Sequence, residues 1–252
     1  MTMTIDGPAG QLYVDDGGHA GLPVLLVHSF AGSTAHWKSQ LSHLRQRRRA
    51  IAMDLRGHGR SDPPADGDYG VPQLARDIAA VADALELRRF VLVGHSLGGS
   101  AAAAFAGEHP GRLRGLVLAG TPGKTPAEMA RKVLDGLRSD YDKVMGGYSA
   151  SLLAGAQAAV RDELEAQMQR VPREQAIAIV AAAFDFDPLP PLARYAGSKL
   201  IIDTPHGDGP AALHAQLPDV TRKLVTGTSH WPQLDKPQEF NRLLDEYLAW
   251  MA

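Results

Sequence analysis

The chain has 252 residues, of which 44% are hydrophobic and 21% are charged, a balance typical of a globular protein with a sizeable core. Its formal net charge of -2 gives no reason to expect nucleic acid or an anionic membrane surface as a partner. Because there is no cysteine, disulfides, thiolate nucleophiles and cysteine metal sites are excluded.

The N-terminal segment, Met1–Pro8, shows neither the basic start nor the apolar stretch of a secretory signal. No apolar run approaches the roughly 20 residues that span a bilayer. We therefore expect a soluble, cytoplasmic protein that does not bind membranes.

Short apolar runs without strict alternation recur along the chain, as in strands that are buried on both faces of a parallel sheet. The predicted strands are Val24–Val27, Ala50–Met53, Phe90–Val93, Gly115–Ala119, Leu200–Ile202 and Lys223–Val225. Between these strands, apolar residues recur with the three- and four-residue spacing of a helix, most clearly over 71–85. The same spacing appears after the last strand, over 240–248. This alternation predicts an α/β fold, with a mostly parallel central sheet and helices on both faces.

The segment 122–191 interrupts the alternation. It has helical patterns over 127–137 and 156–169, shows no convincing strand, and ends in a proline-rich loop over 185–191. A helical insertion between two strands explains this most simply. We therefore expect a core domain of residues 1–121 and 192–252, with residues 122–191 as a helical cap.

The third predicted strand leads into the motif Gly94-His95-Ser96-Leu97-Gly98, which is followed by an alanine-rich, helix-favouring segment. A serine on so sharp a strand-to-helix turn sits in strained backbone, which the flanking glycines accommodate. The turn would expose the Ser96 hydroxyl as a nucleophile and point the Leu97 N–H towards a developing oxyanion. The alternative interpretation is a tight turn with a helix-capping serine.

His230 lies in the segment 226–232, between the last predicted strand and the final helix. A histidine on a loop beyond a strand end can reach Ser96, and an ordinary pKa near ~6.5 suits a general base. The remaining histidines show no spacing typical of a metal site, so we expect neither a metal nor a cofactor.

Two carboxylates follow the fifth predicted strand and are candidates to orient His230. Asp208 lies in the loop beyond the strand, and Asp203 lies at the strand end. We favour Asp208 because an orienting acid normally occupies a loop position. Its alternative role is the N-cap of a helix beginning near Pro210.

Two further motifs follow the first and second strands, at His28-Ser29-Phe30 and at 54–62. Together with the serine and histidine motifs, in this order, they make the chain resemble the α/β-hydrolase superfamily. It is most similar to the small, cofactor-free esterase and haloperoxidase-like branch with a helical cap. This resemblance implies that the Phe30 N–H completes the oxyanion hole with Leu97 and that 54–62 is a structural turn. The chain departs from the family pattern at Ser29, where glycine is usual.

The residues flanking these groups are candidates to contact substrate; they are His28, Ser29, His95 and Trp231. We expect a Ser-His-Asp hydrolase that cleaves a small carboxylic ester through an acyl-enzyme. A perhydrolase or a carbon–carbon bond hydrolase would use the same triad. A different class, a small-molecule receptor with little turnover, is compatible with the same fold.

Overall fold

The computed structural model describes residues 1–209 and 211–251. Its centre is a sheet with the strand order β1-β2-β4-β3-β5-β6-β7-β8. The strands are β1 (Thr2–Gly7), β2 (Gly10–Gly17), β3 (Val24–Val27), β4 (Ala50–Met53), β5 (Phe90–His95), β6 (Leu113–Ala119), β7 (Lys199–Asp203) and β8 (Thr221–Leu224). The pairs from β4 to β8 are parallel, whereas β1 and β2 pair antiparallel and join the sheet through β4.

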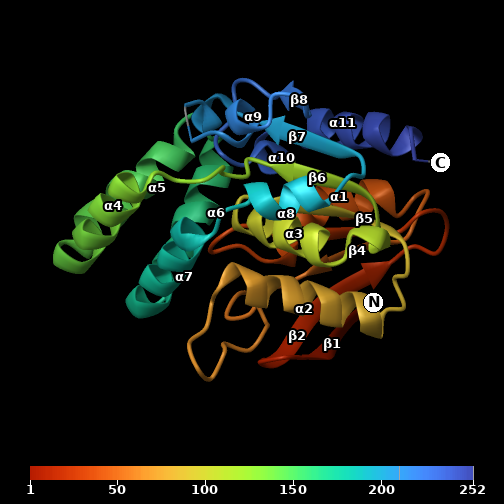
Figure 1. Ribbon diagram of the computed structural model, residues 1–252, viewed down its shortest axis with the longest axis horizontal. Coiled ribbons are helices and arrows are strands. Elements are labelled where there is room, and N and C mark those ends of the chain that lie inside the picture. Colours follow the sequence, from red (N-terminus) through yellow and green to blue (C-terminus); the bar gives the residue numbers. More distant parts are fainter. Residues whose placement is uncertain (210, 252) are drawn as a thin grey trace.

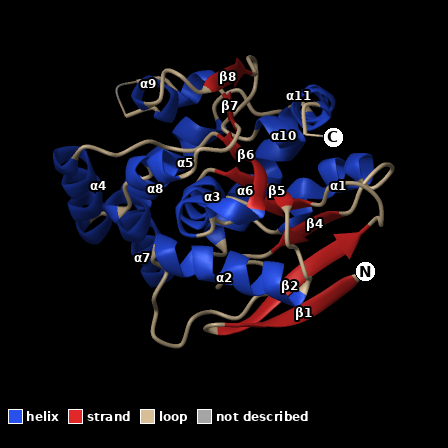
Figure 2. Ribbon diagram, turned by 45° about the vertical axis from the view of Figure 1, so that its right-hand side comes forward, coloured by secondary structure: helices blue, strands red, loops and turns tan. Residues whose placement is uncertain are grey.

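The helices lie on both faces of this sheet and on a projection at its carboxyl edge (Figures 1 and 2). They are α1 (Lys38–Leu44), α2 (Val71–Ala84), α3 (Leu97–Glu108), α4 (Ala127–Ser139), α5 (Tyr141–Leu153), α6 (Ala158–Gln169), α7 (Arg173–Asp185), α8 (Leu189–Arg194), α9 (Leu213–Gln216), α10 (Pro232–Asp235) and α11 (Pro237–Ala249). Short 3-10 turns occupy η1 (Thr34–Trp37), η2 (Pro110–Arg112) and η3 (Pro205–Gly207). None of the helices in the described part of the chain has the length and apolar character that a bilayer crossing requires.

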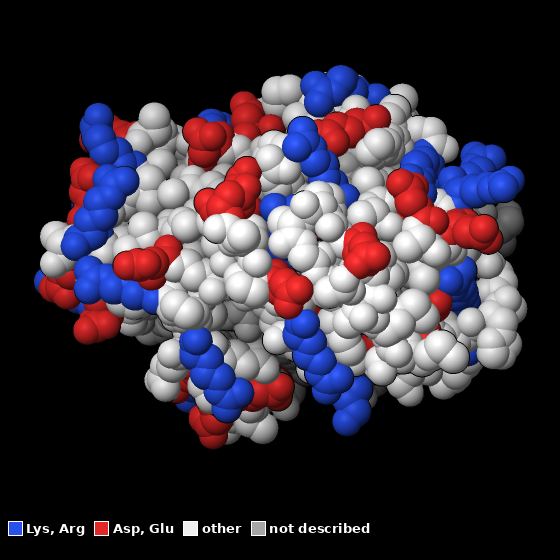
Figure 3. Space-filling view, turned by 90° about the horizontal axis from the view of Figure 1, so that it is seen from below, with Lys and Arg blue, Asp and Glu red and all other residues white. Residues whose placement is uncertain are grey.

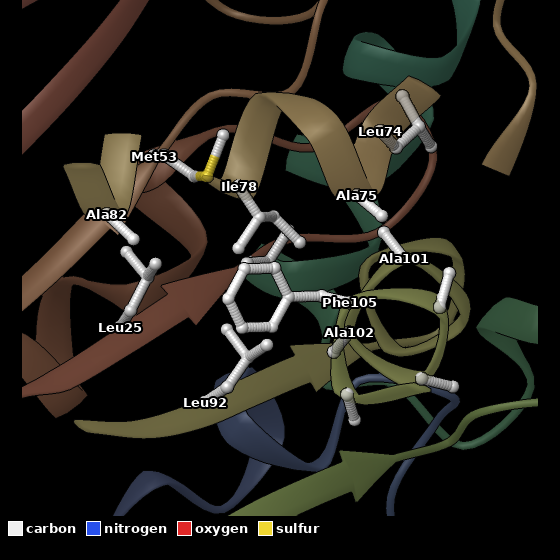
Figure 4. Close-up of a cluster of buried hydrophobic side chains, with 14 of the residues drawn as sticks. Leu25, Met53, Leu74, Ala75, Ile78, Ala82, Leu92, Ala101, Ala102 and Phe105 are labelled. Atoms are coloured by element: carbon white, nitrogen blue, oxygen red, sulfur yellow. The ribbon is translucent and has the colours of Figure 1, made fainter. Parts of the chain in front are cut away.

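Alternate residues of the central strands enter two separate hydrophobic clusters. Leu25 of β3 packs with α2 and α3, where Ile78 and Phe105 meet over Leu92 (Figure 4). Leu26, the next residue, packs on the opposite face with α1 and α11. Burial on both faces explains why these strands lack alternation, and it confirms the predicted α/β class.

All six predicted strands are present, and the last, β8, begins two residues earlier than predicted. Two strands, β1 and β2, were not predicted; they form an antiparallel hairpin whose side chains are mostly exposed or half-buried. The loop predicted over 185–191 is wrong in its second half, because α8 begins at Leu189. Pro190 and Pro191 fit the first helical turn, where a backbone N–H is not needed.

The helices α4–α7 project from the carboxyl edge of the sheet, on the left of Figure 1. They fall within the predicted cap of residues 122–191. Helix α8 instead packs against α3 of the core, and Gly107 of α3 lies directly against Pro191.

The charged side chains are mixed in sign. On the face drawn in Figure 3, Lys and Arg are interspersed with Asp and Glu. This distribution agrees with a net charge close to zero.

Candidate active site

The turn between β5 and α3 holds Ser96 in strained backbone. Its φ of 51° and ψ of -114° lie outside the usual regions for a residue with a side chain. The turn is tight, since a Cβ on Gly94 would lie 2.3 Å from the Gly98 carbonyl oxygen, and one on Gly98 would lie 2.4 Å from that of His28. Ser96 is half-buried while its neighbours on both sides are buried, so its side chain stands at the rim of the core.

Leu97 is the first residue of α3, and its N–H is therefore one that the helix itself does not use. The positive end of the helix dipole lies at the same point. The Leu97 side chain is buried in the core cluster with α2 and α3, which fixes the Leu97 N–H in place.

The loop after β3, residues 28–33, passes the turn at Ser96, since a Cβ on Gly98 would lie 2.4 Å from the His28 carbonyl oxygen. We name it the oxyanion loop after the role expected for Phe30. The Ser29 carbonyl accepts hydrogen bonds from His28 Nδ1 at 2.7 Å and from the Gly32 N–H at 3.1 Å. His28 Nε2 accepts from the Leu55 N–H at 2.9 Å, which leaves the ring proton on Nδ1. In a trans peptide the C=O and the following N–H point in opposite directions, so anchoring the Ser29 carbonyl also fixes the Phe30 N–H.

His230 lies in a loop, residues 226–231, that we call the base loop. Its ring lies against Gly120 at the end of β6, where an added Cβ would meet His230 Cε1 at 3.1 Å. The His230 N–H donates to the Leu152 carbonyl of α5, at 2.9 Å. Its carbonyl accepts from His95 Nε2 at 2.8 Å, which ties the base loop to the neighbour of Ser96.

Burial, with a smaller contribution from the nearby His206, lowers the pKa of His230 to about 4. The ring is therefore neutral near pH 7 and has a lone pair for a proton. Burial also lowers the pKa of His95 well below its ordinary value. Gln233 donates to His95 Nδ1 at 3.2 Å, consistent with a neutral His95 that carries its proton on Nε2.

The candidate acids lie at the end of β7 and in the segment 204–209, which we call the acid loop. Asp203 is buried, and its two oxygens bind the Thr204 N–H at 3.0 Å and His214 Nδ1 at 2.8 Å. The Asp208 side chain is 55% exposed, and its Oδ1 binds Arg222 at 2.5 Å. Within residues 1–209 and 211–251, neither carboxylate is hydrogen-bonded to the His230 ring.

The alternative role of Asp208 is not seen, because the helix after the acid loop, α9, begins at Leu213 with Ala212 as its N-cap. Pro210, where that helix was expected to begin, lies outside the described residues. His214, which the sequence gave no reason to single out, binds Asp203 and lies 3.6 Å from Asp208.

The four residues expected to contact substrate are at most 1% exposed; they are His28, Ser29, His95 and Trp231. Their polar side-chain atoms bind protein groups, as described for the two histidines. Trp231 Nε1 likewise donates to Ser29 Oγ at 3.1 Å. In this structure these residues hold the loops of the candidate site in place.

Asp235, the last residue of α10, anchors the base loop. It is 2% exposed, and its Oδ2 accepts from the Ser229 N–H at 2.8 Å and from the Ser229 hydroxyl at 2.5 Å. Its Oδ1 accepts from the N–H of Gln157, just before α6, at 3.0 Å. The spacing of six residues between Ser229 and Asp235 is a local signal that could have identified this contact.

A cavity of about 330 Å³ lies beside the oxyanion loop, between the core and the projecting helices. Its lining is Ala31, Gly32, Ser33, Gly57, His58, Gly59, Gln167, Arg170, Val171, Pro172 and Gln175. The described residues bring together no group of three or more acidic or histidine side chains suited to a metal ion.

The model of the alpha/beta hydrolase fold family matches residues 23–200. Over its length the chain is similar to 2-hydroxy-6-oxo-2,4-heptadienoate hydrolase of Pseudomonas putida, with 32% identity covering 91% of this chain and 90% of the relative. A 2-hydroxymuconate semialdehyde hydrolase of Pseudomonas putida is 30% identical, over 91% of this chain and 88% of its own. Among solved structures, Est816, an N-acyl homoserine lactone degrading enzyme, is 25% identical with a TM-score of 0.85, covering 97% of this chain and 100% of its own.

Proposed function

Since the chain belongs to the alpha/beta hydrolase fold family, we propose that it is a serine hydrolase that cleaves a small carboxylic ester with Ser96 as nucleophile. The observation that carries this proposal is a strained, half-buried serine whose neighbour, His95, is hydrogen-bonded to the carbonyl of a buried and neutral histidine, His230. Strain of this kind persists only where the surrounding structure holds it, and it is concentrated at functional sites.

In the proposed reaction, His230 takes the proton of the Ser96 hydroxyl as its oxygen attacks the substrate carbonyl. The Phe30 and Leu97 N–H groups bind the negative oxygen that forms. His230 then gives the proton to the departing alcohol, leaving an acyl-enzyme. Water, deprotonated by His230, attacks the acyl carbonyl and releases the acid and free Ser96.

Protonated His230 needs a negative partner during this cycle, because burial alone opposes its charge. We propose that Asp208 of the acid loop supplies it, in preference to Asp203 at the end of β7. Both oxygens of the buried Asp203 already bind protein groups, whereas the exposed Asp208 has to give up a surface ion pair with Arg222 and a longer contact, 3.6 Å, with His214.

We propose that helices α4–α7 act as a cap that selects the substrate. The cap side chains nearest the base loop are apolar, since Leu153, Leu164 and Met168 form one cluster with Trp231. An apolar surround of this kind favours a small or medium acyl group, or an aromatic ester.

Carbon–carbon bond hydrolysis is the second candidate, because the two relatives with full-length similarity carry the names of such hydrolases. The same serine would attack a ketone carbonyl, and the bond to the neighbouring carbon would break. That carbon leaves with the electron pair, so the substrate must stabilise it as an enolate.

The test compares the wild-type protein with Ser96→Ala and with a matched control, Ser42→Ala, at an exposed serine on α1. Each is incubated with p-nitrophenyl acetate, p-nitrophenyl butyrate, 2-hydroxy-6-oxo-2,4-heptadienoate and a fluorophosphonate probe. We expect repeated turnover of an ester and labelling, both absent in Ser96→Ala and intact in Ser42→Ala.

Turnover of the dienoate alone would replace the ester assignment with the second candidate. Labelling without turnover of any substrate would favour a receptor. Absence of labelling would contradict an activated serine.

A further inference from the structure

A pair of hydrogen bonds joins the base loop to the oxyanion loop. Trp231, next to His230, donates its indole N–H to Ser29 Oγ at 3.1 Å. The Ser29 hydroxyl in turn donates to the Phe30 carbonyl at 3.3 Å. The pair therefore connects the neighbour of the candidate base to the residue that carries one of the oxyanion N–H groups.

Both side chains are shielded from water, because Ser29 and Trp231 are each 1% exposed. An indole has a single donor, and leaving it unpaired at a buried position is costly. A side chain without an acceptor at position 29 would leave the indole N–H unpaired. The link thus requires a hydrogen-bond acceptor at this position, which alanine or glycine cannot supply.

The indole also contacts the candidate base directly. Its ring lies edge-on to the His230 ring, with the centroids 5.2 Å apart and an interplanar angle of 88°. On its other sides it packs in the apolar cluster with Leu153, Leu164 and Met168 of the cap. Its position therefore helps to set that of the His230 ring.

The oxyanion loop needs such support because its backbone is strained. Ala31 has a φ of 57°, an unfavourable value for alanine. The Ser29 hydroxyl binds the carbonyl of the peptide between Phe30 and Ala31, at the entrance to this strained residue. Without that bond the loop has less to hold it in the conformation that presents the Phe30 N–H.

We propose that Ser29 is a positioning residue. Its hydroxyl, bonded to Trp231 and to the Phe30 carbonyl, fixes the position of the His230 ring relative to the Phe30 N–H. This role rests on the proposed serine hydrolase function. It acts on the geometry of the reacting groups and leaves the binding of substrate unchanged.

The experiment is a double-mutant cycle with Ser29→Ala, Trp231→Phe and the double variant, measured on whichever substrate the wild type turns over. Each single variant should lower kcat about 3- to 10-fold, with KM within about 2-fold of wild type. The double variant should lose no more than the worse single variant, because either change breaks the same link. Ser42→Ala and Trp250→Phe, at exposed positions, should leave kcat unchanged.

If the loss of kcat in the double variant equals the product of the two single losses, the two residues act independently and the proposal is wrong. A lower melting temperature with unchanged kcat would reduce the link to a purely structural one and also overturn the proposal. If Ser29→Ala fails to fold, the kcat of Trp231→Phe, which lacks the indole donor, tests the link instead. If the wild type shows neither labelling nor turnover, the proposed serine hydrolase function is wrong, and so is the role of Ser29 that rests on it. If labelling depends on Ser96 but the cycle gives a different result, only the role of Ser29 is wrong.

Discussion

The base loop and the acid loop both lie at the carboxyl edge of the sheet, yet they are held in different ways. The base loop is fixed by hydrogen bonds to His95, to Leu152 of α5, to Asp235 and to Ser29 of the oxyanion loop. The acid loop is held by the exposed ion pair of Asp208 with Arg222 and by His206, which donates to the Thr228 carbonyl at 3.1 Å. Buried bonds resist rearrangement, whereas an exposed ion pair contributes little.

This difference separates two requirements of the proposed chemistry. The position of His230 relative to Ser96 is set in advance by the folded chain. Its carboxylate partner has to be recruited, because neither Asp203 nor Asp208 is bonded to it among the described residues. The contrast predicts that removing an anchor of the base loop such as Asp235 costs stability, whereas changes to the exposed acid loop act mainly on turnover.

The largest expected effect is on turnover in the acid loop. Asp208→Asn should lower kcat about 10³-fold, because an amide cannot stabilise protonated His230. Asp203→Asn should lower it less than about 10-fold, since that carboxylate already serves His214 and Thr204. Steady-state kinetics with the ester that the wild type cleaves fastest measures both values of kcat. A larger loss of kcat in Asp203→Asn than in Asp208→Asn would assign the acid to Asp203.

The next effect is on stability in the base loop. Asp235→Ala should lower the free energy of unfolding by about 3 kcal/mol, because the Ser229 and Gln157 N–H groups lose a buried charged acceptor. The matched control, Asp208→Ala, removes an exposed carboxylate and should cost under about 1 kcal/mol. Urea denaturation of both variants tests this, and equal losses would remove the distinction between the loops.

The sequence predicted the turn at Ser96 well because the cause of that turn is local. A serine between two glycines, after a buried strand and before a helix, leaves few backbone solutions, and the observed φ of Ser96 is one of them. The base loop was also placed correctly between β8 and the final helices. The catalytic roles of Ser96 and His230 stay predictions that the proposed kinetics will test.

The remaining features depend on contacts between distant segments. Ser29 and Trp231 are separated by 202 positions, and neither residue alone indicates the other as its partner. The ion pair of Arg222 with Asp208 likewise joins β8 to the acid loop. Such pairings follow from how the elements pack, which spacing along the chain does not encode, and this is why the acid could not be assigned from sequence.

Acidification should weaken the base loop. The pKa of His230 falls from 6.5 in the unfolded chain to about 4 in the folded one. The unfolded state therefore binds the proton first, so stability is complete above pH 6.5 and declines as the pH falls towards 4. Such a pKa difference amounts to at most about 3 kcal/mol.

Urea midpoints measured between pH 7 and 4 test this dependence. His230→Gln should show a shallower decline than wild type, because the other buried histidines still titrate in it. An unchanged slope in His230→Gln would mean that His230 does not contribute.

The smallest expected effect concerns the ion pair that holds Asp208. Arg222→Gln should lower the free energy of unfolding by about 1 kcal/mol, since it removes the pair with the exposed Asp208 and a longer contact, 3.4 Å, with the buried Asp203. Because the same contact competes with His230 for the carboxylate, its loss should raise kcat about 2-fold, and 0.5 M NaCl should do the same to wild type. Salt should then have no further effect on Arg222→Gln. A fall in kcat in this variant would instead mean that Arg222 holds Asp208 in its working position, which would make the acid loop as preorganised as the base loop.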